Sequence, residues 1–494
     1  MSASELDVFV VGAGLSGIGA AWRLKTELPR LRFALLEARS ASGGTWDLFR
    51  YPGVRSDSDM LTLGYSFRPW TAAQAIAPGP DILRYLRESA EQLGIEPLIR
   101  YQHRVVEARW SSPEARWTLE VEVGPERRRE QLRCRFLYLC SGYYDYARAH
   151  APRFPGALEF RGRLVHPQWW PEGLDCAGKK VVVIGSGATA VTLVPALAGQ
   201  GAQVTMLQRS PTWIVSLPND VIARAARALL PPRLAYALVR AKNTLRQMAA
   251  YAFCRWWPEA GAALMLRDVA RHLPEGYPVE RHFMPRYPPW AQRVCFVPDA
   301  DLFKAISSGR AHVVTDTIER FTEKGIQLTS GQHLDADVIV TATGLKLLPA
   351  GGVRALVDGQ PVRLNERLVY RGMMLDGVPN LAWCVGYTNA SWTLRADLVS
   401  RWVCRLLKHL ERSAFDTAAP RAAGVGPGRA AILDLQAGYI TRSLGELPLQ
   451  GTEAPWLVRQ NYLLDYFVTR FEPLDDGVLE FSRSAAFGLP VSGR

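Results

Sequence analysis

Two glycine-rich turns in this chain combine residue types and spacing suited to holding a nucleotide. The first follows apolar residues 8–11 and reads Gly12-Ala13-Gly14-Leu15-Ser16-Gly17; the second follows apolar residues 181–184 and reads Gly185-Ser186-Gly187-Ala188-Thr189-Ala190. Glycines at these positions let the backbone approach a pyrophosphate at the N-terminus of the helix that follows. Two such turns predict two bound dinucleotides, with electrons passing from one to the other.

The residue that ends the second strand of each unit indicates which nucleotide binds, because a carboxylate there bonds ribose hydroxyls while a basic residue accommodates a 2′-phosphate. In the first unit, apolar residues 33–36 end in Glu37, which suits FAD or NAD. In the second unit the equivalent position has Arg209 and Ser210 and no acid. Since a guanidinium binds phosphate through charge-assisted hydrogen bonds, the second site is predicted to take NADPH.

The elements around these turns predict an α/β fold with two doubly wound, Rossmann-like dinucleotide-binding domains and a helical insertion. Alternating residues near 103–110, 116–123 and 132–140 predict an antiparallel insertion, and the Pro-, Gly- and Trp-rich residues 150–178 have a linker-like composition. We expect a discontinuous FAD-binding domain (1–149 and 346–494), an NADPH-binding domain (150–215 and 291–345) and a helical insertion (216–290).

Length and composition exclude several classes of protein. With 494 residues, 48% of them apolar, the chain can form two or three globular domains. No apolar run approaches the ~20 residues of a membrane span, and the N-terminus lacks a signal-peptide pattern. The seven cysteines are never spaced as CxxC, which argues against a disulfide framework, a zinc site or a dithiol centre. We expect a cytoplasmic protein without a metal ion.

The formal net charge of +12 favours anionic partners. No nucleic-acid-binding module is recognisable, so the expected anions are phosphorylated cofactors or anionic membranes. Residues 221–257 contain no acid but seven basic residues: Arg224, Arg227, Arg233, Arg240, Lys242, Arg246 and Arg255. Two interpretations stay open: a packed helical insertion with solvated arginines, or peripheral contact with an anionic membrane.

Several motifs resemble those of the Baeyer–Villiger monooxygenase family. They are FxGxxxHxxxWP at 160–171, GGTW at 43–46, and YPG at 51–53 followed by Asp57. Related flavin-containing monooxygenases usually end the first motif in a residue other than tryptophan. The blocks at 55–60 and 288–293 look most like the branch that contains the ethionamide-activating monooxygenase. With both glycine turns and Ala342-Thr343-Gly344, the resemblance covers nearly the whole chain.

The resemblance implies a monooxygenase cycle. NADPH reduces FAD, the reduced flavin binds O₂, and an anionic C4a-peroxyflavin attacks a ketone carbonyl to give an ester or lactone. Arg293, by its place in the matching block, is the expected cation that keeps the peroxide anionic, and Asp57 is the partner that orients it. Arginine suits this role because it keeps its proton at working pH.

The nucleotide units and the resemblance together give the expected cofactor-binding residues. They are Gly12, Gly14, Ser16, Gly17, Glu37, Thr45, Trp46, Arg55, Ser56, Asp57, Val105, His166, Trp170, Gly185, Ser186, Gly187, Ala188, Thr189, Arg209, Ser210, Thr343 and Gly344. The motif that contains His166 and Trp170 precedes the second unit, so we expect it to couple the domains and shape the nicotinamide approach. A packing role for His166 is the alternative. Trp392 either approaches the cleft or packs in the core.

The expected substrates are O₂ and a lipophilic ketone or thioether-type molecule. One alternative is a heteroatom oxygenase, in which the protonated hydroperoxyflavin oxidises sulfur or nitrogen. Another is a peripheral membrane-binding flavoprotein without monooxygenase turnover, against which the intact glycines and Glu37 argue. A pyridine-nucleotide disulfide reductase is disfavoured because no paired cysteine motif is present.

Overall fold

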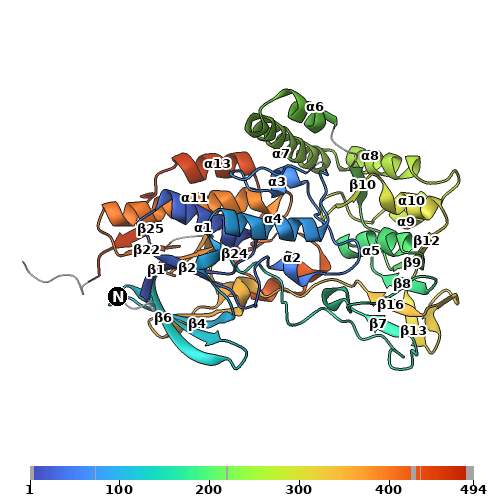
Figure 1. The fold of residues 1–494 in the computed structure, drawn as a ribbon, viewed down its shortest axis with the longest axis horizontal. Coiled ribbons are helices and arrows are strands. Elements are labelled where there is room, and N and C mark those ends of the chain that lie inside the picture. The colour runs from blue at the N-terminus through green and yellow to red at the C-terminus, as the bar shows by residue number, and fades with distance from the viewer. Residues whose placement is uncertain (1–4, 73, 218–220, 424–429, 434, 485–494) are drawn as a thin grey trace, which may run out of the picture.

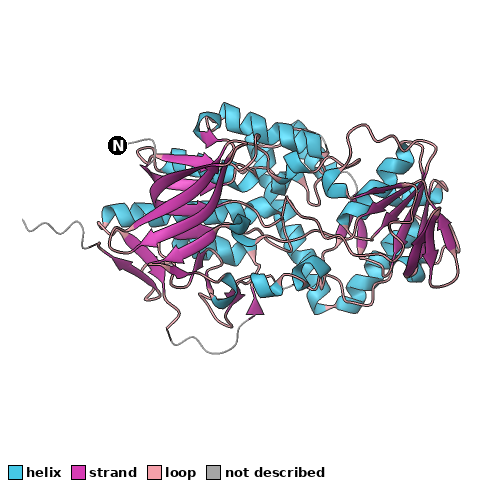
Figure 2. Cartoon of the chain, turned by 90° about the horizontal axis from the view of Figure 1, so that it is seen from below, coloured by secondary structure: helices cyan, strands magenta, loops and turns pink. Residues whose placement is uncertain are grey.

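Two sheets, each with parallel strands next to one of the glycine turns, dominate the architecture. A computed structural model describes residues 5–72, 74–217, 221–423, 430–433 and 435–484. The larger sheet lies on the left in Figure 1 and the smaller on the right. Figure 2 shows the two sheets from below, at opposite ends of the molecule with helices between them.

The larger sheet contains the first nucleotide unit. Its parallel strands run in the order β3 (Ile99–Arg100), β2 (Phe33–Leu36), β1 (Glu5–Val11), β6 (Arg128–Leu139) and β21 (Leu381–Trp383). Strand β2 is buried throughout, as its continuous apolar run requires. Helix α1 (Leu15–Glu27) follows β1 and packs against α11 (Trp392–Arg412).

An antiparallel layer extends this sheet, as the alternating residues predicted. Strand β4 (His103–Ser111) pairs with β5 (Arg116–Val123), which pairs with β6. β6 serves both layers, because its residues 128–134 pair antiparallel with β5 and its residues 133–139 pair parallel with β1. The remaining strands of this sheet are β17 (Arg354–Val357), β18 (Gln360–Pro361), β19 (Val369–Tyr370) and β20 (Met374–Leu375).

The smaller sheet contains the second nucleotide unit. Its parallel strands run in the order β12 (Ala311–Thr315), β9 (Gln203–Gln208), β8 (Lys180–Ile184), β16 (Val338–Thr341) and β7 (Arg163–Val165). Helices α5 (Ala188–Gly199) and α10 (Asp301–Ser307) pack together beside it. A three-stranded antiparallel sheet adjoins it: β13 (Ile318–Thr322), β14 (Gly325–Leu328) and β15 (His333–Asp335). The predicted fold class is confirmed.

Residues 150–178, whose composition is linker-like, contain strand β7, which the sequence did not predict. This strand pairs with β16 at the edge of the smaller sheet. Only Val165 of its three residues is buried. An edge strand this short has almost no apolar pattern, so its sequence resembles a loop.

The predicted helical insertion comprises α6 (Val221–Leu229), α7 (Pro232–Trp256), α8 (Pro258–Arg271) and α9 (Val279–Phe283). It lies between β10 (Ile214–Leu217) and β11 (Cys295–Pro298), which pair with each other in parallel. Figure 1 shows α6 and α7 along the upper edge of the molecule.

Helix α7 docks on the short helix α3 (Met60–Leu63) of the first domain. Arg240 Nη1 donates to the carbonyl oxygens of Leu61 and Gly64, both at 2.7 Å, and so caps the C-terminus of α3. At the other end of α3, the buried Asp59 carboxylate accepts from Thr62 N at 3.0 Å. The same carboxylate accepts from Asn243 Nδ2 at 3.1 Å and Gln247 Nε2 at 2.6 Å of α7.

The other elements complete the two domains. They are α2 (Thr45–Leu48), α4 (Gly79–Gln92), α12 (Gly438–Thr441), α13 (Tyr462–Phe471), β22 (Thr417–Pro420), β23 (Ala430–Ala431), β24 (Leu449–Gln450), β25 (Leu479–Ser482) and the 3₁₀ turns Glu96–Leu98, Pro167–Trp169, Pro349–Gly352, Leu364–Glu366 and Leu444–Glu446. Within the described ranges, no helix combines the length and hydropathy that crossing a bilayer requires.

Replacing Asp59 by alanine should lower the free energy of unfolding by about 2 kcal/mol, because α3 loses its cap and two buried amides lose their acceptor. Thermal unfolding followed by tryptophan fluorescence measures the change. Asn461→Ala is the control, since Asn461 Oδ1 caps the more exposed helix α13 by accepting from Leu464 N at 3.2 Å. An equal loss in both variants would contradict the docking role of Asp59.

Candidate active site

The principal cavity, of about 480 Å³, lies between the two nucleotide units. Its wall combines the first glycine turn, the loop that carries Asp57, the residues after β6, the start of α5 and residues 293–296. A volume in this range is typical of small-molecule sites, and a domain junction is a common place for them. The cavity therefore brings together segments from the whole chain.

Most predicted site residues line this cavity: Gly12, Gly14, Ser16, Glu37, Thr45, Trp46, Arg55, Ser56, Asp57, Val105, Ala188, Thr189 and Arg293. A small adjoining hollow is lined by His166, Thr189 and Gly344. The predicted residues that line neither space are Gly17, Trp170, Gly185, Ser186, Gly187, Arg209, Ser210 and Thr343. Most of this last group belongs to the second nucleotide unit, which meets the cavity at the start of α5.

The first turn has the close backbone contacts that only glycine allows. Gly12 has φ +103°, and a Cβ built there would lie 2.7 Å from the Cys140 carbonyl oxygen. A Cβ at Gly17 would lie 1.9 Å from the Gly12 carbonyl oxygen. Helix α1 begins after Gly14 with no acid in its first turn, and no described side chain caps it. Its backbone N–H groups thus suit the pyrophosphate of FAD.

Glu37 stands at the cavity wall as the ribose position requires. Its Oε2 accepts from Ala13 N at 2.8 Å and its Oε1 accepts from Arg39 N at 2.9 Å. Burial raises the pKa of Glu37, although these two backbone donors act to lower it. Each carboxylate oxygen has further lone pairs, so the residue fits hydroxyl donors from a ribose.

A tyrosine that sequence reasoning missed supports this end of the cavity. The Tyr146 hydroxyl lies 3.0 Å from Thr45 Oγ1, and the Arg39 guanidinium stands 5.7 Å from the centre of the Tyr146 ring. Arg39 also pairs with the buried Asp47 at 2.5 Å. The aromatic run after β6, at residues 143–146, was the available signal, because loops after parallel strands meet at the ligand-binding edge of the sheet.

The second turn leaves open space over a helix N-terminus. Gly185 has φ +135°, and a Cβ there would lie 2.4 Å from the Ala342 carbonyl oxygen, so the segment 342–344 packs on the turn. Helix α5 has Gly187 as its N-cap and no acid in its first turn. No described atom lies within 4 Å of a Cβ built at Gly187. This space fits the pyrophosphate of NADP.

Arg209 and Ser210 follow β9 and are exposed beside this turn. Ser186 Oγ donates to the Ser210 carbonyl oxygen at 3.0 Å, which holds the strand end against the turn. An exposed guanidinium here can reach a 2′-phosphate without the cost of burying a charge.

The segment that contains His166 connects the two domains. His166 Nδ1 accepts from Gln168 N at 3.1 Å, and Gln168 Nε2 donates to the carbonyl oxygens of Asp145 and Tyr146 at 2.9 and 3.1 Å. Burial lowers the pKa of His166, and its Nε2 has no partner among the described atoms. Trp170 packs against the core of the second domain. These contacts support the expected coupling role.

Tyr51, from the YPG motif, also reaches the second domain. Burial raises the pKa of Tyr51 to about 12, while a hydrogen bond with Thr189 acts in the opposite direction. Nearby, Arg55 forms an ion pair with Asp301 at the start of α10. The loop that carries Asp57 is therefore held against the second domain on both sides.

Arg293 and Asp57 form an ion pair, with Nη2 and Oδ2 2.8 Å apart. Burial acts to lower the pKa of Arg293, but the Asp57 carboxylate raises it above its usual range; Tyr439, Tyr143 and Tyr144 are its other close neighbours. The guanidinium is therefore a permanent cation at the cavity wall. The tyrosines around it were not predicted, and burial raises the pKa of each, so their hydroxyls stay protonated.

Trp392 lines the cavity and also packs against the core of the first domain, so the structure shows both of the alternatives considered for it. Its Nε1 donates to Ser16 Oγ at 2.8 Å, and its ring lies 5.0 Å from that of Tyr143. A Cβ at Gly386 would lie 2.3 Å from the Trp392 ring, so that glycine makes room for the indole.

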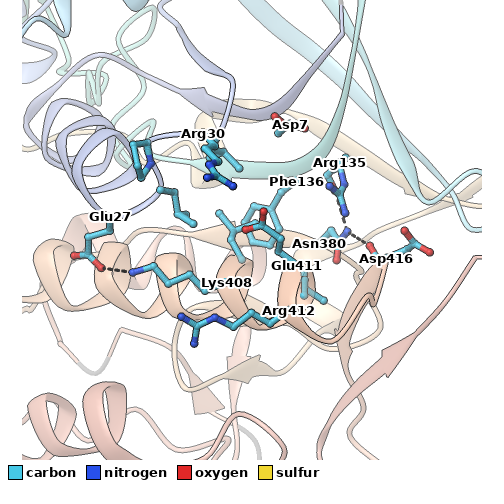
Figure 3. A pocket seen from close by; sticks show the side chains of 15 residues that line it. Asp7, Glu27, Arg30, Arg135, Phe136, Asn380, Lys408, Glu411, Arg412 and Asp416 are labelled. Carbon is cyan, nitrogen blue, oxygen red and sulfur yellow. Dashed lines mark hydrogen bonds and ion pairs between the residues drawn. The ribbon is translucent and has the colours of Figure 1, made fainter.

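A second hollow, of about 370 Å³, lies at the C-terminal end of α1 beside α11 (Figure 3). Lys408 pairs with Glu27 at 3.4 Å in this hollow. Its lining includes four acids and four bases: Asp7, Glu27, Glu411, Asp416, Arg30, Arg135, Lys408 and Arg412. None of the predicted site residues lines this space. Its balanced charge favours no ligand class, so the principal cavity is the candidate site.

Two glycine turns at helix N-termini, a strand-end acid and a cation, all at or next to one cavity, are features expected of an oxidoreductase that uses a flavin and a nicotinamide nucleotide. The sequence model of the flavin-binding monooxygenase-like family matches residues 76–414, and that of an NAD(P)-binding Rossmann-like domain matches residues 10–75. The FAD-containing monooxygenase EthA of Mycobacterium tuberculosis (strain ATCC 25618 / H37Rv) is 53% identical over 484 residues, 98% of this chain and 99% of the relative. The chain belongs to the flavin-binding monooxygenase-like family.

Solved structures agree with this assignment at the level of the fold. A steroid monooxygenase bound to NADP aligns over 97% of this chain and 100% of its own, with a TM-score of 0.77 and 22% identity. OTEMO in complex with FAD and NADP aligns over 85% of this chain and 88% of its own, with a TM-score of 0.70 and 23% identity. The predicted cofactors, FAD and NADP(H), and the predicted resemblance are confirmed.

Gly17→Ala should weaken FAD binding by about tenfold or more, because the new methyl group would force the turn apart. Flavin fluorescence on titration of the apoprotein measures the dissociation constant. Gly199→Ala is the control, since no described atom lies within 4 Å of a Cβ there. Unchanged FAD affinity in the Gly17 variant would refute the assigned role of the first turn.

Arg209→Ala should raise KM for NADPH by about tenfold and leave KM for NADH unchanged, because only NADPH has the 2′-phosphate that the guanidinium binds. Stopped-flow reduction of the flavin by each nucleotide gives the ratio. The matched control is Gln203→Ala, which changes an exposed residue at the opposite end of β9. Equal effects on both nucleotides would place the 2′-phosphate elsewhere.

Proposed function

We propose that this monooxygenase inserts one oxygen atom from O₂ next to a ketone carbonyl, with NADPH as reductant, and releases an ester or lactone. Bound FAD, once reduced, supplies the activated oxygen. The residues of the chain must then bind the ketone, exclude water and stabilise the charge that develops during attack on the carbonyl.

The Arg293–Asp57 pair is the observation that carries this proposal. Arg293 precedes β11 and Asp57 belongs to the first domain, so the pair joins these two segments at the wall of the cavity between the two nucleotide units. Asp57 fixes the orientation of the guanidinium, and the raised pKa of Arg293 keeps it charged. A fixed cation favours an anionic oxygen donor, which is the form that adds to a carbonyl.

The cavity wall favours a lipophilic substrate. It includes the aromatic side chains Trp46, Phe49, Tyr143, Tyr144, Phe296 and Trp392 and the aliphatic side chains Leu345, Leu348 and Val353. Apolar walls exclude water and bind apolar groups in proportion to the area that they cover. A lipophilic ketone suits this surface, and so does a thioether.

Oxygenation of sulfur or nitrogen is the second candidate, because the apolar part of the cavity wall suits a thioether as well as a ketone. Turnover of phenylacetone and of a matched thioether under ¹⁸O₂, with NADPH consumption and products both quantified, tests the two candidates. Labelled sulfoxide without labelled ester would refute carbonyl insertion.

Arg293→Ala should raise the activation free energy of ester formation by about 3 kcal/mol, because the developing negative charge loses its cation. The rate of ester formation should therefore fall roughly a hundredfold. NADPH oxidation should continue and become uncoupled from product formation. Gas chromatography of the ester against NADPH consumption measures this ratio. An unchanged ratio would show that the cation has no role in the chemistry.

Arg293→Lys provides the control in pH dependence. Because the pKa of Arg293 is raised, the wild-type ester yield should not titrate with this group below its ordinary pKa. Lysine titrates near pH 10, so the variant should lose yield as the pH rises past about 10. Identical pH profiles in the two proteins would contradict the proposal that the charge itself is required.

A further inference from the structure

Helix α7 exposes an apolar stripe on the side that faces away from α3. Leu234, Leu238, Leu245 and Trp256 are 48, 52, 53 and 71% exposed, and Ala241 and Ala249 between them are exposed as well. These positions are spaced by three, four or seven residues, so they share one face of the helix. The opposite face is buried against the rest of the protein through Ala235, Tyr236, Val239, Asn243 and Thr244.

The charge of α7 has a single sign. The helix contains five basic residues and no acid over Pro232–Trp256. Arg240 points inward and caps α3, whereas Arg233, Arg246 and Arg255 are exposed. Helical periodicity puts Arg233 and Arg255 on one side of the stripe and Arg246 on the other. The side chains of Arg224 and Arg227 in α6 lie outside the described residues.

Two tryptophans mark the junction of α7 and α8. Trp256 and Trp257 are 71 and 56% exposed, and their rings meet edge to face with centroids 5.9 Å apart. Indole rings with an apolar body and a polar N–H favour the boundary between headgroups and acyl chains. An exposed tryptophan pair at the end of an exposed leucine stripe is therefore suited to a bilayer surface.

The same charges disfavour a second copy of the chain as the occupant of this face. In a symmetric dimer, α7 would face α7, and its arginines would meet without any acid on the helix to pair with them. An anionic bilayer supplies the opposite charge to the arginines and apolar chains to the stripe at once.

We propose that the outer face of α7, with Trp257 at its junction with α8, lies on the surface of an anionic bilayer. The helix would lie in the plane of the headgroups, because none of the described helices can span a membrane. Tyr251 of α7 meets Trp290 edge to face at 5.5 Å, and Trp290 belongs to the loop that leads to Arg293. Delivery of lipophilic substrate from the bilayer to the cavity rests on the proposed function; the binding itself does not.

Flotation of the full chain with bound FAD tests the binding. Vesicles of equal phosphatidylglycerol and phosphatidylcholine at low salt should carry the protein to the top of a sucrose gradient. Vesicles of phosphatidylcholine alone should not, and 1 M NaCl should release it, since the screening length falls to about 3 Å. Because no turnover is measured, failure here leaves the oxygenation proposal untouched, and failure of oxygenation leaves this result untouched.

Two double variants separate charge from apolar contact. Arg246→Gln with Arg255→Gln should weaken partitioning about fivefold per arginine, or about 25-fold in total. Leu238→Ser with Leu245→Ser should weaken it by about tenfold or more. The control is Leu158→Ser, because Leu158 is fully exposed on the segment before β7, which lies along the lower edge in Figure 1. FAD absorbance and circular dichroism confirm that each variant is folded. If the leucine variant does not fold, the arginine variant alone tests the proposed membrane binding.

Three outcomes would overturn the proposal. They are the absence of flotation with anionic vesicles at low salt, equal flotation with neutral vesicles, and undiminished binding by both double variants. A concentration-dependent dimer that the leucine variant abolishes, without lipid binding by the wild type, would instead assign this face to self-association.

Discussion

The ion pair between Arg293 and Asp57 is the interaction on which the site depends. It joins the loop before β11 to the loop before α3 at 2.8 Å, and each partner needs the other there. A guanidinium without a carboxylate partner would have no fixed orientation, and an unpaired carboxylate would repel the anionic groups that the cavity must hold. The surrounding contacts hold the two loops in place: Arg55 pairs with Asp301, and Tyr51 meets Thr189.

The two glycine turns depend on a different physical constraint, which is how closely the backbone can approach itself. Gly12 and Gly17 in the first turn, and Gly185 in the second, occupy positions where a methyl group would overlap a carbonyl oxygen. Each turn presents uncapped N–H groups of a helix whose first turn has no acid. The same local geometry thus occurs twice: the first turn lines the cavity, and the second reaches it through Ala188 and Thr189 at the start of α5.

Helix α7 connects the site to the molecular surface. Its inner face holds the cap residue Asp59 through Asn243 and Gln247, two residues along the chain from Asp57. Its outer face carries the exposed leucines and arginines. The interpretation of this segment as a packed helical insertion describes the inner face of α7 correctly. It does not explain why the outer face exposes leucines. A helix that is buried on one side and exposes apolar residues on the other needs a separate explanation for the exposed side.

Much of this protein could be read from local sequence, and the rest depends on contacts between distant segments. The glycine turns, Glu37, Arg209 and the α/β class were predictable, because turn chemistry and apolar periodicity act over a few residues. The site roles given to individual residues remain predictions. Strand β7 escaped prediction because its pairing with β16, rather than its own residues, makes it a strand.

Tertiary structure alone decided which side chains surround the cation and which face of α7 stays exposed. Tyr143, Tyr144 and Tyr439 have no spacing that links them to Arg293, and Tyr146 reaches Thr45 only because the residues after β6 and the loop after β2 meet at one sheet edge. The apolar positions of α7 look alike in sequence on both of its faces. Packing against α3 buried one set and left the other in solvent, since burial depends on what the rest of the chain covers.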